Sequence, residues 1–366
     1  MTDASRGAAG VSAPFPYVDP TRELVAAIQE LSLARTLPKI QEIVRKAARN
    51  LTGADGATFV LREGGNCHYA DEDAISPLWK GQRFPLEDCI SGWAMLNRRP
   101  AVIEDIYADE RIPHQAYRPT FVKSLAMIPI RSSEPVGAIG NYWAKRHRPT
   151  DREVGLLQAL ADSTAVAMEN VLLYERLEEE RVDSLRKLAR VAEFRDDASG
   201  SHAERVGRLS GLVAAQLGLP SREAELIQHA APLHDIGKVA IADSILLKPA
   251  KLDEEEFAEI RKHPAVGAEI LAGSNSDVLC LAEQIALGHH ERWDGSGYPA
   301  GVSGNAIPVA SRIVAIVDSF DALTHDRPYR RARSVASARE EIQCLSGSHF
   351  DPEVARAFEQ LDPIPA

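Results

Sequence analysis

Cysteine is scarce in this chain of 366 residues. Its four cysteines, Cys67, Cys89, Cys280 and Cys344, are widely separated and form no CxxC pair. This spacing excludes a disulfide framework and a zinc ribbon, and it favours a reducing compartment, so we expect a cytoplasmic protein. Long hydrophobic runs are missing too, because no stretch approaches the roughly 18 consecutive apolar residues of a membrane helix. A membrane is therefore not expected as a partner.

A basic start followed by an apolar run is also lacking, so we predict no secretory signal and a disordered tail over residues 1–20. Basic residues are outnumbered: 42 Lys and Arg face 53 Asp and Glu, for a formal net charge of −11. Proteins that bind nucleic acids usually carry a basic field, so DNA is not expected as a partner. The composition, 45% hydrophobic and 26% charged, is that of a globular protein, and the length suggests about two domains.

The first part of the chain has the pattern of an α+β domain. Helical spacing of apolar residues predicts two helices between Thr21 and about Leu51, and a return helix from about Asp151. Between them, Gly, Pro and polar clusters separate short β-like segments, as in an antiparallel sheet. These segments cover 57–62, 67–70, 101–106, 125–131 and 136–144.

The return helix is predicted to continue into a long connecting helix, because Gly155 is the only glycine or proline between Arg152 and Asp196. Within it, an apolar series has the spacing of a short coiled-coil seam. The series is Val182, Leu185, Ala189 and Ala192. It predicts a parallel homodimer, and the alternative is a solvated helix on a monomer.

Histidine clusters in the last part of the chain, which is helical in pattern from Ser201 to about Gln360. Of the 11 histidines, eight lie between His202 and His349. One Gly- and Pro-rich loop, 292–308, interrupts the helices, and loops of that length in a compact domain are usually functional.

Seven histidines and aspartates in or beside these helices form a candidate metal site. They are His202, His234, Asp235, His263, His289, His290 and Asp318. Imidazole and carboxylate without thiolate suit Fe, Mn or Zn. Adjacent helical residues point about 100° apart, so the two adjacent pairs predict two ions with an aspartate bridging them. Two ions about 3.5–4 Å apart would clamp a phosphoryl group.

Groups suited to phosphate accompany these ligands. Lys238 follows His234–Asp235 closely, and Arg327 and Arg330 follow Asp318 in the sequence. A guanidinium matches a pair of phosphate oxygens. Asp321 lies one helical turn from Asp318, where it either supports a metal ligand or contacts substrate.

The motifs that carry these residues resemble, together and in order, the HD-GYP family of cyclic-di-GMP phosphodiesterases. They are APLHDIGK (231–238), ILLKPAKL (245–252), KHPAVGAEIL (262–271), HHERWDGSGYP (289–299), IVAIVDSFDALTHDRPY (313–329) and GSHFDPE (347–353). The resemblance implies an all-α metallohydrolase that converts cyclic-di-GMP to pGpG and, in many members, on to GMP. Its metal would be iron, or in some members manganese.

The resemblance also implies roles for individual residues. All seven candidate ligands would hold the metals, with Asp235 bridging. Catalysis would rest on His234, Asp235 and Lys238. The substrate would be bound by Lys238, Asp321, Arg327, Arg330 and a signature loop of Gly297, Tyr298 and Pro299. Two alternatives stay open: hydrolysis of 3′,3′-cyclic GMP-AMP, and a non-catalytic protein that binds the dinucleotide and signals through the GYP loop to a diguanylate cyclase.

One position departs from the family pattern. Many members carry a glutamate four residues before the first histidine ligand, where it helps to build a third metal position, and here that residue is Ala198. Alanine has no ligand atom, so we predict a dinuclear centre. By analogy, the second cleavage, from pGpG to GMP, is expected to be weaker.

The first part of the chain resembles a GAF sensory domain, through its element pattern and DCISGWAMLNRRPAVIEDI (88–106). The expected organisation is thus a GAF domain over 21–170, a connecting signalling helix over 171–197 and an HD-GYP domain over 198–366. In this fold class an antiparallel sheet flanked by helices is joined by a long helix to an all-α domain. The sequence does not reveal the ligand of the GAF domain.

Overall fold

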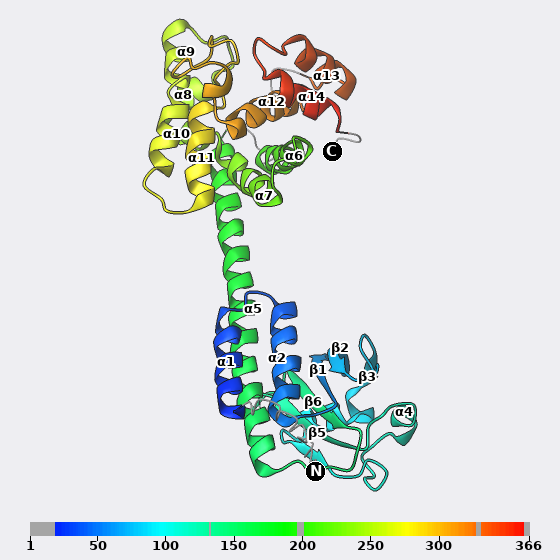
Figure 1. Cartoon of the computed structure of the whole chain (residues 1–366). Coiled ribbons are helices and arrows are strands. Elements are labelled where there is room, and N and C mark those ends of the chain that lie inside the picture. The colour runs from blue at the N-terminus through cyan, green and yellow to red at the C-terminus, as the bar shows by residue number, and fades with distance from the viewer. Residues whose placement is uncertain (1–18, 132, 196–200, 327–330, 362–366) are drawn as a thin grey trace, which may run out of the picture. The chain divides into compact units, whose positions relative to one another are not determined.

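The computed structural model describes residues 19–131, 133–195, 201–326 and 331–361 (Figure 1). Contacts divide the chain into two units, Met1–Leu177 and Glu178–Ala366. The predicted disordered tail falls almost wholly outside the described residues, and the first helix begins at Pro20. Among the described residues, none of the helices combines the length and the apolar character needed to cross a membrane.

The first unit is built on one antiparallel sheet, as predicted. Its strand order is β3-β2-β1-β6-β5-β4. The strands are β1 (Gly56–Glu63), β2 (Asn66–Ala74), β3 (Arg83–Pro85), β4 (Ala101–Ile103), β5 (Ser124–Ile130) and β6 (Gly137–Trp143). The sequence pattern did not predict β3, which has only three residues and pairs with β2 through Cys67 and its neighbours.

Both faces of this sheet are covered, because alternate residues of a strand point to opposite sides. Ile128 lies in a core shared with residues of α1 (Pro20–Leu33), α2 (Leu37–Thr52) and the first part of α5. Figure 1 shows these three helices beside the sheet. The neighbouring Met127 packs on the other side, in a core that includes residues of α3 (Ile90–Leu96). Two short elements complete the unit, η1 (Leu86–Asp88) and α4 (His114–Tyr117).

The long helix is confirmed as α5 (Asp151–Glu193), a single helix of 43 residues. Its first part contributes Leu157 and Leu160 to the core of the first unit. The predicted coiled-coil seam was wrong in its residues, because Leu185, Ala189 and Ala192 are buried in the core of the second unit. The periodicity marked a buried face, but that face is covered by the chain's own helices.

In the second unit the described residues form helices joined by loops, and their only β-type pairing is one isolated bridge between Ser346 and Phe350. Its α-helices are α6 (His202–Gln216), α7 (Ser221–Ala230), α8 (Asp243–Leu246), α9 (Glu254–Ile260), α10 (His263–Leu271), α11 (Asp277–Gly288), α12 (Val309–Thr324), α13 (Val335–Cys344) and α14 (Pro352–Glu359). Short 3₁₀ segments are η2 (Ala231–Leu233), η3 (Ile236–Ala240) and η4 (Gly304–Ala306). All four cysteines of the chain are free thiols.

Candidate metal centre

The seven predicted ligands come from five places in the second unit and meet in two clusters. The first cluster consists of Asp235, His263, His289 and His290, and the second of His202, His234 and Asp318. Within each cluster the ligand atoms all lie within 4.8 Å of one another. The sequence prediction that these residues come together is therefore matched by the geometry.

Local sequence features bring the ligand-bearing segments into contact. His263 begins α10, where Pro264 in the first turn favours helix initiation. Gly237 in η3 packs against this residue: a Cβ at position 237 would lie 2.0 Å from the carbonyl oxygen of His263. Only glycine permits this approach, which places Asp235 beside His263.

The first cluster has the spacing of a single-ion site. Nε2 of His263 lies 3.2 Å from Oδ1 of Asp235, and Nε2 of His289 lies 3.6 Å from the same oxygen. The two Nε2 atoms are 3.3 Å apart. Ligand atoms bound at about 2.1 Å can be separated by at most about 4.2 Å, so one ion can reach all three.

The second cluster meets the same limit and shares a ligand with the first. Oδ1 of Asp318 lies 3.4 Å from Nε2 of His202 and 4.0 Å from Nε2 of His234. The other carboxylate oxygen of Asp235, Oδ2, is 3.3 Å from Nε2 of His234. Asp235 thus presents one oxygen to each cluster, which is the arrangement of a bridging carboxylate.

The hydrogen bonds of the histidines leave Nε2 free to bind a cation. In three of them Nδ1 faces backbone carbonyl oxygens, which can only accept, so Nδ1 carries the proton. The pairs are His234 with Ala231 (2.9 Å), His263 with Ile260 (2.7 Å), and His289 with Ala286 (3.0 Å) and Ile285 (3.1 Å). An outward Nδ1–H is the usual way in which proteins orient a metal-binding imidazole.

His202 is oriented by a carboxylate instead. Its Nδ1 lies 2.7 Å from Oδ2 of Asp321, which Arg205 also holds through bonds of 2.6 and 2.8 Å. Although burial opposes ionisation, Arg205 and His202 hold the pKa of Asp321 well below its usual range. The ionised carboxylate accepts the Nδ1 proton and turns Nε2 towards Asp318. The geometry therefore places Asp321 behind a candidate ligand.

Two buried polar atoms support the fit to a cation. Nε2 of His234 and Oδ1 of Asp235 have no hydrogen-bond partner in the part of the chain that the structure describes. Their side chains are 0% and 10% exposed. Buried polar atoms are normally paired, and these two point at the positions where the clusters would hold ions. The donor set suits iron, manganese or zinc.

At Asp235, His289 and His290 the electrostatics favour the protonation states that metals require. Burial works against ionisation of Asp235, but the charges of Lys238 and His234 hold the pKa of this carboxyl well below its usual range. Burial lowers the pKa values of His289 and His290. Burial also opposes protonation of His234, yet Asp235 raises its pKa to about 9. A cation in the site takes the place of that proton.

Two family models match the chain. Residues 186–354 match the HD domain, and residues 34–169 match the GAF domain. The chain contains a GAF domain and an HD domain. The metal clusters all lie within the HD domain, and the antiparallel sheet lies within the GAF domain.

Curated relatives are similar to this chain over part of their length. The cyclic di-GMP phosphodiesterase response regulator RpfG of Xanthomonas campestris is 42% identical over 240 residues, 63% of this chain and 64% of that protein. A cyclic di-GMP phosphodiesterase of Thermotoga maritima is 49% identical over 172 residues, 47% of each chain. The 3'3'-cGAMP-specific phosphodiesterase 2 of Vibrio cholerae is 42% identical over 199 residues, 54% of this chain and 38% of that protein. The chain thus spans less than two thirds of the length of each.

The structure also locates the remaining predicted residues of the HD domain. Nζ of Lys238 lies 2.7 Å from Oδ2 of Asp235, at the edge of the bridging carboxylate. The ring of Tyr298 stacks on His290 with centroids 4.8 Å apart. Arg327 and Arg330 lie outside the described residues, and so does Ala198.

The GYP loop is fixed by close backbone packing. A Cβ on Gly297 would lie 2.3 Å from the amide nitrogen of Arg292, so only glycine fits there. Pro299 is followed by Ala300 and Gly301, whose amides donate to Oε1 of Glu291 at 2.8 and 3.1 Å. Glu291 is buried, and its carboxylate ties the far side of the loop to the helix end that carries His289 and His290.

Sequence reasoning missed Glu193, Arg205 and Glu291. Each is a charged residue, and charged residues are usually solvated. Glu193 is buried, and burial raises its pKa against the attraction of His202 and His234. Arg205 lies one helical turn after His202, and Glu291 follows His290, so proximity to a ligand was the signal available.

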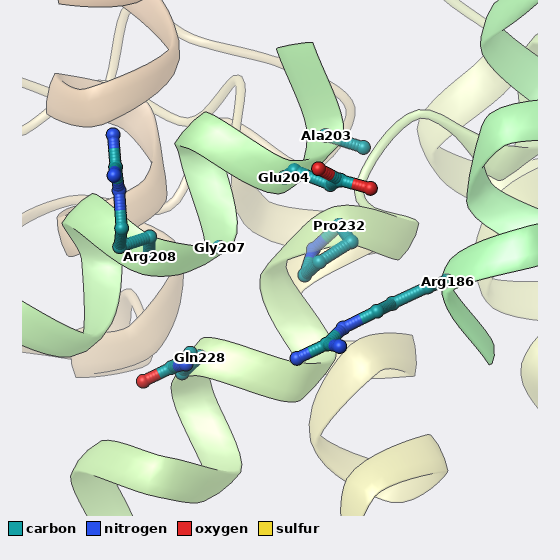
Figure 2. A pocket seen from close by; sticks show the side chains of 7 residues that line it. All are labelled: Arg186, Ala203, Glu204, Gly207, Arg208, Gln228 and Pro232. Atoms are coloured by element: carbon teal, nitrogen blue, oxygen red, sulfur yellow. The ribbon is translucent and has the colours of Figure 1, made fainter. Parts of the chain in front are cut away.

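A cavity of about 270 Å³ opens between α5, α6 and the α7–η2 segment (Figure 2). It is lined by Arg186, Ala203, Glu204, Gly207, Arg208, Gln228 and Pro232. Figure 2 shows Arg186 reaching across it while Arg208 and Gln228 point elsewhere. No predicted ligand lines this cavity, and its polar groups do not converge, so we do not assign it to the substrate.

Proposed function

We propose that this chain is a metal-dependent phosphodiesterase that hydrolyses cyclic-di-GMP to pGpG, regulated by its GAF domain. One observation carries the proposal: two clusters of imidazole and carboxylate ligands share Asp235 as a bridge. The names of RpfG and of the Thermotoga relative support cyclic-di-GMP as the substrate.

The chain's own residues supply positioning and charge. Two divalent ions bound at the clusters would polarise a phosphate oxygen and lower the pKa of a water molecule. Asp235 and His234 hold the bridge between the two clusters. The Lys238 ammonium lies beside this bridge, 2.7 Å from Oδ2 of Asp235. There it would stabilise the negative charge that develops on the phosphate.

Iron is the proposed metal, with manganese second, and the proposed nuclearity is two. Imidazole with carboxylate ligands suits both metals, and the two clusters provide one site each. We keep Arg327 and Arg330 as proposed phosphate and base contacts. Tyr298, stacked on His290 and 5.1 Å from the Arg261 guanidinium, is proposed to border the substrate pocket with Gly297 and Pro299.

Asp235→Ala tests the function. We expect turnover of cyclic-di-GMP to fall to background in anaerobically purified full-length protein, because both clusters lose a ligand, while circular dichroism stays unchanged. Asp277→Asn, a change at an exposed residue that pairs with Arg222, is the control and retains activity. Product analysis by liquid chromatography is the measurement. Activity retained by Asp235→Ala would refute the mechanism.

The same assay separates the two alternatives. The Vibrio relative is named for 3'3'-cGAMP, so cyclic GMP-AMP is compared with cyclic-di-GMP and linear pGpG as substrates. Faster hydrolysis of cyclic GMP-AMP would change the substrate and keep the chemistry. Tight binding without hydrolysis in fully metallated wild-type protein would favour a signalling protein that acts through the GYP loop.

We also propose a parallel homodimer, formed through a different face of α5 from the one predicted. Val166, Leu173 and Leu177 are 60%, 54% and 61% exposed and follow one another at seven and four residues. That spacing is typical of a coiled-coil seam. A glutamate in such a seam places like charges opposite each other, so Leu173→Glu with Leu177→Glu should give monomers in light scattering. Glu175→Lys, on the opposite side of the helix, should leave the dimer intact, and a monomeric wild type would refute the proposal.

A further inference from the structure

Glu193, the last residue of α5, is buried beside the second cluster. Its side chain is 4% exposed, and neither carboxylate oxygen has a hydrogen-bond partner of normal geometry among the described residues. Burying a carboxylate is costly unless it is paired with a cation or coordinates one. The attraction of His202 and His234 and the backbone amide of Ala203 favour the ionised form of Glu193. No described side chain donates a hydrogen bond of normal geometry to it, whereas Arg205 donates two to Asp321.

The position of Glu193 fits the metal site. Its Oε1 lies 3.9 Å from Nε2 of His202, and that same nitrogen lies 3.4 Å from Oδ1 of Asp318. Two atoms bound to one ion at about 2.1 Å can be at most about 4.2 Å apart, so an ion can contact Glu193 and His202 together. Nδ1 of His202 is engaged by Asp321, so Nε2 is the atom that faces both acids.

The segment that carries Glu193 is held on both sides. Before it, Ala189 and Ala192 are buried in the core of the HD domain. After it, Nη1 of Arg195 donates to the carbonyl oxygens of Lys238 and Val239 at 3.1 and 3.0 Å. The carboxylate is thus positioned by packing and by bonds to η3, the segment that also carries Lys238. Metal ligands need this kind of support.

We propose that Glu193 is a ligand of the metal ion held by His202, His234 and Asp318. This assignment rests on the metal centre of the proposed function. Position 198 is alanine and can supply no ligand atom. Glu193 would instead supply a carboxylate from the connecting helix. The helix that begins in the GAF domain at Asp151 therefore ends in a metal ligand.

Metal titration of the full chain tests the assignment. Metal-free wild-type protein and Glu193→Gln are titrated with Mn²⁺ under anaerobic conditions, and free Mn²⁺ is followed by electron paramagnetic resonance. We expect wild type to bind two equivalents, one per cluster. In Glu193→Gln the first equivalent should bind normally and the second about 10- to 100-fold more weakly. Glu179→Gln, an exposed change on the same helix, should match wild type.

The outcomes are distinguishable. If Glu193→Gln binds both equivalents with wild-type affinity while its metal-free form melts at a different temperature, Glu193 only pairs with His202, and the assignment is wrong. Glu193→Asp keeps the charge on a shorter side chain, so it should lower the affinity for the second equivalent of Mn²⁺ less than Glu193→Gln does. If Glu193→Gln does not fold, the affinities of Glu193→Asp decide the assignment. Hydrolysis is assayed in parallel. Wild-type protein that binds Mn²⁺ but cleaves no cyclic dinucleotide would refute the proposed function. The Mn²⁺ affinities of wild type and Glu193→Gln would still test whether Glu193 is a ligand.

Discussion

Two buried hydroxyl pairs of the GAF domain and the two candidate clusters of the HD domain differ in how their polar atoms are satisfied. In the interior of the GAF domain, two pairs of buried hydroxyl groups lie within hydrogen-bond distance of each other. The hydroxyl of Tyr142 lies 2.9 Å from Oγ1 of Thr58, and the hydroxyl of Tyr69 lies 3.1 Å from Oγ of Ser91. In the HD domain, Nε2 of His234 and Oδ1 of Asp235 are buried without a hydrogen-bond partner in the described part of the chain.

This difference separates polar pairs that are already complete from buried atoms that a bound cation would satisfy. A satisfied polar pair needs nothing further, and replacing both partners with apolar groups costs little. An array of unpartnered acceptors is costly by itself and becomes favourable when a cation binds. Outward hydrogen bonds, such as that from Nδ1 of His263 to Ile260, prevent the histidines from turning away. The acceptor atoms of the HD domain are therefore already oriented towards the positions that a cation would occupy.

The largest effect should come from breaking the unsatisfied array. His263→Ala removes a ligand that is 1% exposed and lies 3.2 Å from Asp235. We expect affinity for the first equivalent of metal to fall about 100-fold or more, because even an indirect partner of a ligand contributes 10- to 100-fold. Metal analysis and turnover are the measurements. Tyr69→Phe, in the GAF interior, should leave the metal content unchanged.

One outcome would contradict the assignment of the metal centre to the HD domain. If His263→Ala kept two equivalents of metal while Tyr69→Phe lost one, the two clusters would not be the metal centre.

The sequence predicted the ligands better than it predicted their supports. Histidine and aspartate are recognisable as residue types that bind metals, so motif and spacing pointed to all seven residues that the structure gathers in the two clusters. Glu193 looks like the charged end of a solvated helix, and only the packing of Ala189 and Ala192 shows that it is buried. A sequence identifies a charged residue, but it does not show whether the folded chain buries that side chain.

The α5 helix illustrates a second limit. Apolar periodicity shows that one face of a helix is covered, but it does not identify what covers it. Leu185 was predicted to contact another chain, and it packs in the HD domain core. Leu173 and Leu177, which the sequence pattern did not single out, are exposed on the same helix. Intramolecular and intermolecular burial use the same residues, so tertiary contacts are needed to separate them.

A smaller effect is expected from a change beside the array. Gly297→Ala places a methyl group 2.3 Å from the amide nitrogen of Arg292, so the GYP loop must move. Overpacking of this kind costs about 1–3 kcal/mol. Tyr298 should leave its stacked position on His290. We expect kcat/KM for the cyclic dinucleotide to fall about tenfold, equivalent to about 1.4 kcal/mol, with the metal content unchanged.

Steady-state kinetics and metal analysis check this result together. Ser296→Ala is the control, because Ser296 is an exposed neighbour whose hydroxyl donates to Oδ1 of Asp294 at 2.6 Å. A loss of metal in Gly297→Ala would mean that the loop holds the clusters together and does not merely border them.

The smallest effect should come from the satisfied interior of the GAF domain. Tyr142→Phe leaves the fully buried Thr58 hydroxyl without its partner, so the domain should lose about 1–2 kcal/mol of its free energy of unfolding. Adding Thr58→Val removes the second partner and should recover most of that loss. Urea unfolding followed by tryptophan fluorescence measures this, because three of the four tryptophans, Trp79, Trp93 and Trp143, lie in the GAF domain. The double variant distinguishes the domains: removing both partners of the GAF pair is nearly neutral, whereas removing further ligands from the clusters can only weaken metal binding. A double variant less stable than Tyr142→Phe would show that the GAF interior also depends on its polar groups for more than mutual satisfaction.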